Sequence, residues 1–70
     1  MAVASVSTIT AASSVSWQDA IDQGFERAHK TLRNITGLQV VEEKARVADG
    51  RITDYLVTLH VIFVLEDPAD

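Results

Sequence analysis

The pattern of apolar and polar positions divides the chain into a short strand, a helix and a long hairpin. In residues Val3–Thr10 successive side chains fall into two alternating sets, and many of them are β-branched, which is typical of a strand. A loop at residues 11–16 follows. Beyond it, apolar residues recur at spacings of three and four, which predicts one stripe along a helix. The stripe consists of Ile21, Phe25, Ala28, Leu32 and Ile35.

Local signals predict where this helix begins and ends. Ser16 is a good N-cap residue, and Asp19 follows three positions later, where an acid favours the helix dipole. The helix is therefore expected to begin at Trp17 and to run for about seventeen residues, to Arg33. Asn34 is its expected terminator.

Two strands, Leu38–Ala48 and Arg51–Leu65, flank Asp49 and Gly50. This dipeptide is typical of a two-residue type I′ turn, which needs positive φ at both positions. In the last strand one side is entirely apolar and is expected to cover the helix stripe. That side consists of Tyr55, Val57, Leu59, Val61, Phe63 and Leu65.

The opposite side of the last strand is mixed, and its register with the preceding strand has two alternatives. It carries Asp54, Leu56, Thr58, His60, Ile62 and Val64. With a two-residue turn, this side is shared by Gln39, Val41, Glu43 and Ala45; a bulged turn shifts the pairing by one residue and exchanges the faces. The predicted fold class is α+β, a βαββ domain over residues 1–70. Residues 1–2 and 66–70 are expected to be flexible.

Composition restricts the function more than it defines it. The 70 residues contain no cysteine, so disulfides cannot supplement the small core, and oligomerisation is the expected supplement. A net charge of −4 argues against nucleic-acid binding, and no apolar run is long enough to span a membrane. The first ten residues lack the pattern of a signal peptide, which favours a cytoplasmic protein. No nucleophile with a base, phosphate loop or carboxylate pair indicates an enzyme.

The order of these elements, with the segments SWQDAI, KTLRN, VVEEKARVADGRI and YLVTLHVIFVLE, resembles the dodecin family over residues 3–67. The resemblance implies a three-stranded antiparallel sheet wrapped on one helix, and subunits that assemble into a hollow homododecamer. It also implies binding or storage of a flavin, riboflavin or FMN. Flavin-binding dodecins stack the ligand on a tryptophan after the helix and bind its polar edge with a glutamine in the last strand.

The resemblance places Gly37 at the tryptophan position and Leu56 at the glutamine position, with Gln39 as a neighbouring pocket residue. Both flavin-binding side chains are therefore missing, which predicts weaker flavin binding. Without the resemblance, Gly37 is interpreted as a glycine that ends the helix or opens the strand. The alternative function is a structural or cation-binding dodecamer that holds calcium or magnesium and no flavin.

Several other residues suit either a ligand-binding role or a simpler structural role. Trp17 is interpreted as a packing residue and His29 as exposed. His60 has two interpretations, as a hydrogen-bonded strand residue or as one of several copies that symmetry gathers into a metal or anion site. Lys30 and Arg33, late on the helix, suit either a phosphate or the helix dipole. Hard cations take oxygen ligands, and the acids near the hairpin are either shared cation ligands or partners of Lys44, Arg46 and Arg51. These acids are Glu42, Glu43, Asp49 and Asp54.

Overall fold

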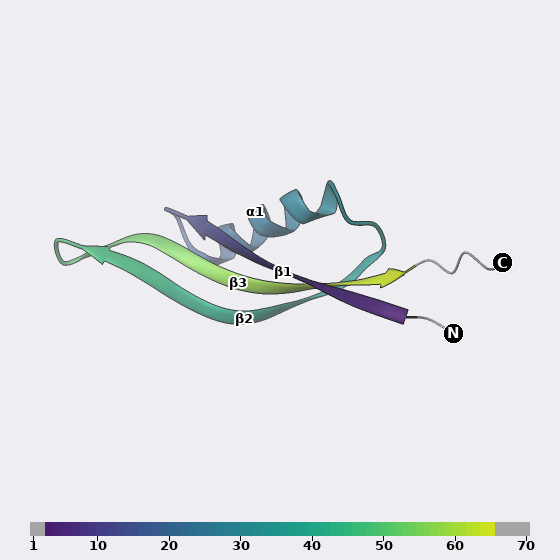
Figure 1. The fold of residues 1–70 in the computed structure, drawn as a ribbon. Helices are drawn as coiled ribbons and strands as arrows, with labels where there is room; N and C mark the ends of the chain where they lie inside the picture. Colours follow the sequence, from purple (N-terminus) through teal and green to yellow (C-terminus); the bar gives the residue numbers. More distant parts are fainter. Residues whose placement is uncertain (1–2, 66–70) are drawn as a thin grey trace.

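The computed structural model of the protein describes residues 3–65, which form a strand, a helix and two further strands. The strands make one antiparallel sheet in the order β1-β3-β2, so that β3 pairs on both sides (Figure 1). The predicted α+β class and βαββ order are confirmed. The flexibility expected for residues 1–2 and 66–70 lies outside the described part. The elements are β1 (Val3–Ser13), α1 (Trp17–His29), β2 (Ile35–Ala48) and β3 (Arg51–Leu65).

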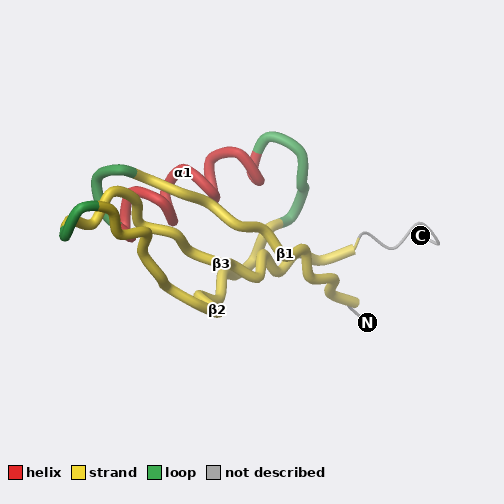
Figure 2. The backbone as a smooth tube through the Cα atoms, turned by 60° about the vertical axis from the view of Figure 1, so that its left-hand side comes forward, coloured by secondary structure: helices red, strands yellow, loops and turns green. Residues whose placement is uncertain are grey.

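Helix α1 packs against β1 and β3 through its smallest side chains. Ala20, Gly24 and Ala28 are buried and lie four residues apart, so they form one line along the helix. The predicted stripe is correct for Ala28, which is buried, and for Ile21, which packs against the core. Phe25, by contrast, keeps 37% of its surface exposed. A stripe of small residues brings the helix backbone close to the sheet, where Leu59 is fully buried. Figure 2 shows the helix lying along the sheet beside β1.

The predicted start of the helix is confirmed, and its predicted end is wrong. The Ser16 hydroxyl accepts the backbone N–H of Asp19 at 2.9 Å. The helix ends at His29, because the N–H groups of Thr31 and Leu32 both donate to the carbonyl of Ala28 and close the last turn. Among residues 3–65 no helix is long and apolar enough to cross a membrane.

The strands on either side of the helix are longer than predicted. Strand β1 continues past Thr10 to Ser13, because Ala11, Ala12 and Ser13 pair with β3 despite the low strand propensity of alanine. Strand β2 begins at Ile35 and not at Leu38. Asn34, with φ of 60°, takes the left-handed conformation that turns the chain back into the sheet.

The hairpin turn is confirmed, and the predicted register is correct only in part. Asp49 and Gly50 have φ of 52° and 73°, as a type I′ turn requires. Gln39 pairs with His60 as expected, but a bulge at Val41 shifts the pairing between there and Arg46. The bulge exchanges the faces of the residues that follow. Glu43 and Ala45, which the sequence placed on the second face, therefore pair with Val57 and Tyr55 on the helix side.

The close contact at Gly24 predicts a strong effect of a larger side chain. A Cβ at this position would lie 3.2 Å from both the Ala11 Cβ and the Leu59 Cδ1, so Gly24→Leu should lower the free energy of unfolding by about 1–3 kcal/mol. Glu26→Leu adds the same side chain at an exposed position, and its effect should stay within about 0.5 kcal/mol. Urea unfolding followed by Trp17 emission at one protein concentration measures both. Equal stability of the two variants would contradict the close packing.

Candidate functional site

The face of the sheet opposite α1, called the open face below, holds every position that the sequence assigned to a ligand pocket. Residues directly opposite each other in antiparallel strands point to the same face, so the register defines rows across the sheet. Each row takes one residue from β1, one from β3 and one from β2. The rows are Val6, Ile62 and Gly37; Thr8, His60 and Gln39; Thr10, Thr58 and Glu42; Ala12, Leu56 and Lys44.

Gly37 lies within β2, where its backbone does not require glycine. It pairs with Ile62, and Gly50 is the one glycine in the described part with positive φ. The interpretation of Gly37 as a helix-ending or strand-opening residue was therefore wrong, because Asn34 makes that turn. A Cβ at Gly37 would meet only Ile62, at the ordinary contact distances of 3.5 and 3.9 Å. The missing side chain leaves space on the open face.

Gln39 and His60 form the polar centre of the open face. The Gln39 Oε1 lies 3.3 Å from the His60 Nδ1, within hydrogen-bonding distance when that nitrogen carries the proton. His60 is half-buried, whereas Gln39 is exposed on the edge strand. The hydrogen-bonded interpretation of His60 thus has a partner, and a gathering of His60 copies around a symmetry axis stays a prediction.

Leu56 lies far from the other two pocket positions. It is only 7% exposed and shares its row with Ala12 and Lys44. At about 3.4 Å per residue, Leu56 is roughly 13 Å along the strand from the row of Gln39 and roughly 20 Å from the row of Gly37. Within one chain, the three predicted residues share a face but do not line a common pocket.

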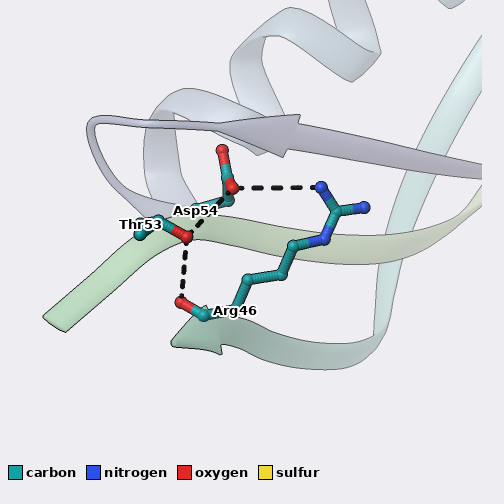
Figure 3. Close-up of polar contacts among 3 residues, drawn as sticks. All are labelled: Arg46, Thr53 and Asp54. Atoms are coloured by element: carbon teal, nitrogen blue, oxygen red, sulfur yellow. Dashed lines mark hydrogen bonds and ion pairs between the residues drawn. The ribbon is translucent and has the colours of Figure 1, made fainter. Parts of the chain in front are cut away.

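Two of the four acidic residues beside the hairpin, Glu42 and Asp54, lie near bases in the same chain. The Glu42 carboxylate lies 3.3 Å from the Lys44 Nζ, and Asp54 lies 3.9 Å from Arg46 (Figure 3). Both pairs are largely exposed, so each contributes about 0–1 kcal/mol. Nowhere in residues 3–65 do three acidic or histidine side chains gather as a cation site would need.

Trp17 packs on the helix side of the sheet, away from the open face. Its ring contacts Tyr55 edge-on at 4.9 Å and 78°, and its indole N–H donates to the Lys44 carbonyl at 2.9 Å. It also packs against the buried core of Ala20, Val57 and Leu59. The interpretation of Trp17 as a packing residue agrees with these contacts. His29 is exposed as expected, and its ring stacks on Phe25 at 5.7 Å.

Sequence reasoning missed a groove between α1 and β1. Its cavity measures about 510 Å³. Ile9, Ala11 and Gly24 form an apolar floor, and Gln23 and Arg27 stand at its rim. The groove depends on the small buried stripe, whose signal was four-residue spacing of Ala and Gly and not the larger apolar side chains. It lies between α1 and the edge strand β1, and Thr10 and Ala12 from the rows of the open face also line it.

The contrast between two glycines can be measured. Gly37→Ala should raise the free energy of unfolding by up to about 1 kcal/mol, because it restricts the unfolded chain and meets no clash. Gly50→Ala should lower it by about 1 kcal/mol or more, because an L side chain is strained at φ of 73°. Thermal unfolding at one concentration gives both values. A destabilised Gly37→Ala variant would mean that the glycine is needed for the backbone after all.

Comparison with known proteins shows relatives with the same fold. A dodecin variant from Thermus thermophilus superposes with a TM-score of 0.90 at 28% identity, over 96% of this chain and 98% of the other. Streptomyces davaonensis dodecin superposes with a TM-score of 0.88 at 33% identity, over 94% of this chain and 97% of the other. A calcium-chelating dodecin from Mycobacterium tuberculosis, described as having a novel calcium-binding site, superposes with a TM-score of 0.79 at 29% identity. The match covers 97% of this chain and 96% of the other. No curated protein sequence matches. The dodecin family model matches residues 3–66, and the chain belongs to the dodecin family.

Proposed function

We propose that the protein is a homo-oligomeric binding or storage protein for a small molecule, with subunits that assemble into a hollow dodecamer and flavin as the ligand class. Family membership supports both parts. The observation that carries the proposal is the open face, because Gly37, Gln39 and Leu56 all lie on the side of the sheet opposite the helix, although in different rows. The apolar row of Val6, Ile62 and Gly37 lies beside the polar row of Gln39 and His60, which suits a flat ligand that is apolar on its faces and polar at its edge.

The spacing of these residues indicates that a pocket would be shared between copies. Gly37 and Leu56 are roughly 20 Å apart along the sheet, which is longer than one ring system. A ligand that contacts both positions therefore needs Gly37 from one subunit and Leu56 from another. Binding and assembly are then linked, because a ligand bound only to the assembled form stabilises it.

The side chains at these positions favour weak binding of a flavin. A stacking partner is worth about 1–3 kcal/mol per ring, with base stacking as the nearest measured comparison, and Gly37 supplies none. Each polar ligand atom left unpaired beside Leu56 costs about 1–3 kcal/mol. Together these losses amount to two or more orders of magnitude in affinity, at about 1.4 kcal/mol per tenfold. Gln39 is the one pocket position that still offers an amide.

A flavin titration tests this function. Assembled protein at micromolar concentration should quench riboflavin or FMN fluorescence weakly, and Gly37→Trp should bind at least about tenfold more tightly, because it restores a stacking ring worth about 1–3 kcal/mol. Gly37→Leu, which fills the same space without an aromatic ring, is the control. The flavin proposal fails if neither wild type nor Gly37→Trp quenches the fluorescence while both remain assembled.

A cation-binding assembly is the second candidate. It is favoured by the 29% identity to a dodecin described as calcium-chelating, and by the exposed carboxylates of Glu42 and Glu43 on the edge strand. Because residues 3–65 of one chain gather no set of three such ligands, a calcium or magnesium site would draw its carboxylates from several copies.

Thermal unfolding separates this candidate from the first. If the assembly binds calcium, the Tm should rise in calcium and fall in EDTA, by several degrees for about 1–2 kcal/mol. Glu42→Gln and Glu43→Gln should each reduce that shift, whereas Asp22→Gln, on the exposed side of α1, should leave it unchanged. A Tm that is unchanged by calcium, magnesium and EDTA would rule out the cation function.

A further inference from the structure

The hairpin of β2 and β3 extends beyond the rest of the subunit. Ser13, the last residue of β1, pairs with Tyr55, so the third strand stops there. Residues 46–54, called the arm below, continue as two strands only (Figure 1). On one side of the arm Val47 and Ile52 are paired, with 67% and 50% of their surfaces exposed. Two large β-branched side chains thus stand at the end of a projecting ribbon.

Polar contacts between its two strands fix the conformation of the arm. The Thr53 hydroxyl donates to the Arg46 carbonyl at 3.4 Å, and Arg46 faces Asp54 across the strands (Figure 3). The type I′ turn at Asp49 and Gly50 fixes the tip. A two-stranded ribbon is marginally stable in water without a hydrophobic face to pack against. An arm of fixed conformation that exposes apolar side chains therefore indicates a contact surface.

The groove between α1 and β1 is complementary to the arm. It has an apolar floor at Ile9, Ala11 and Gly24, and its volume of about 510 Å³ leaves room for more than one aliphatic side chain. The Arg27 guanidinium at its rim makes no ion pair or hydrogen bond with any of residues 3–65. Asp49 at the tip of the arm is likewise exposed and unpaired within that part of the chain.

We propose that the arm of one copy docks into the groove of the next copy, with Val47 and Ile52 on the apolar floor and Asp49 beside Arg27. The apolar surfaces match, and the two unpaired charges have opposite sign. This inference rests on the proposed assembly and assigns one of its interfaces. The contact joins two different surfaces, so it is heterologous, and such contacts close into rings when the rotation allows.

The arm cannot reach the groove of its own subunit. Ala12, at the end of the groove nearest the arm, lies in the same row as Lys44. Asp49 is five residues further along β2, roughly 17 Å away at about 3.4 Å per residue, and the strand runs away from the groove. Only a second copy can bring the two surfaces together.

Engineered cysteines test the contact directly, because the chain has no cysteine of its own. The double variant Gln23→Cys with Asp49→Cys should form disulfides between successive copies and give covalent multimers on a non-reducing gel. Each single variant should stay monomeric on that gel. When the two single variants are unfolded, mixed and refolded, the covalent products should stop at dimers. Absence of cross-links in both experiments, in protein that assembles like wild type, would overturn the proposal.

A substitution on the arm gives an independent readout. Val47→Asp should raise the protein concentration at which half of the assembly dissociates by at least tenfold, because it places a carboxylate on the apolar floor. Val15→Asp, at a position 71% exposed and outside arm and groove, should change it less than twofold. Light scattering measures mass, and near-UV circular dichroism of Trp17 and Tyr55 checks the subunit fold. Unchanged assembly of Val47→Asp would contradict the docking, whereas a monomeric wild type would contradict the proposed dodecamer itself.

Discussion

The close contact between α1 and the centre of the sheet is the constraint on which the rest of the structure depends. Ala20, Gly24 and Ala28 let the helix backbone approach Leu59, and this approach places α1 over β1 and β3. The helix therefore covers one face only. The groove beside β1, the open face on the other side and the arm beyond both are surfaces that residues 3–65 leave uncovered.

Features with a local cause were predictable from the sequence. The N-cap at Ser16 and the turn at Asp49 and Gly50 depend on a few neighbouring residues, and both lie where predicted. The buried side of β3 was also correct, because alternation is a property of the strand itself. The stripe of α1 was correct only in part, because apolar size was taken as the signal, whereas small residues lie where the helix and sheet backbones come close.

Features that depend on distant pairing were not predictable. The bulge at Val41 changes which residues of β2 face the helix, and no residue near it carries a clear bulge signal. For the candidate site, the sequence placed Gln39 and Leu56 on one face correctly. Their separation along the sheet also follows from the predicted pairing of Gln39 with His60, which lies four residues from Leu56 in β3. In the proposed assembly their combination into one pocket would depend on other copies.

The pairing of β1 with β3 has a consequence for how the chain folds. Val3 pairs with Leu65, so one side of the sheet joins segments that are almost as far apart in the sequence as the described chain allows. Contacts of such high sequence separation slow folding, since a long loop must close before they form. During synthesis β1 is made before β3 and must wait for its partner, whereas the hairpin of β2 and β3 needs only contacts between neighbouring segments.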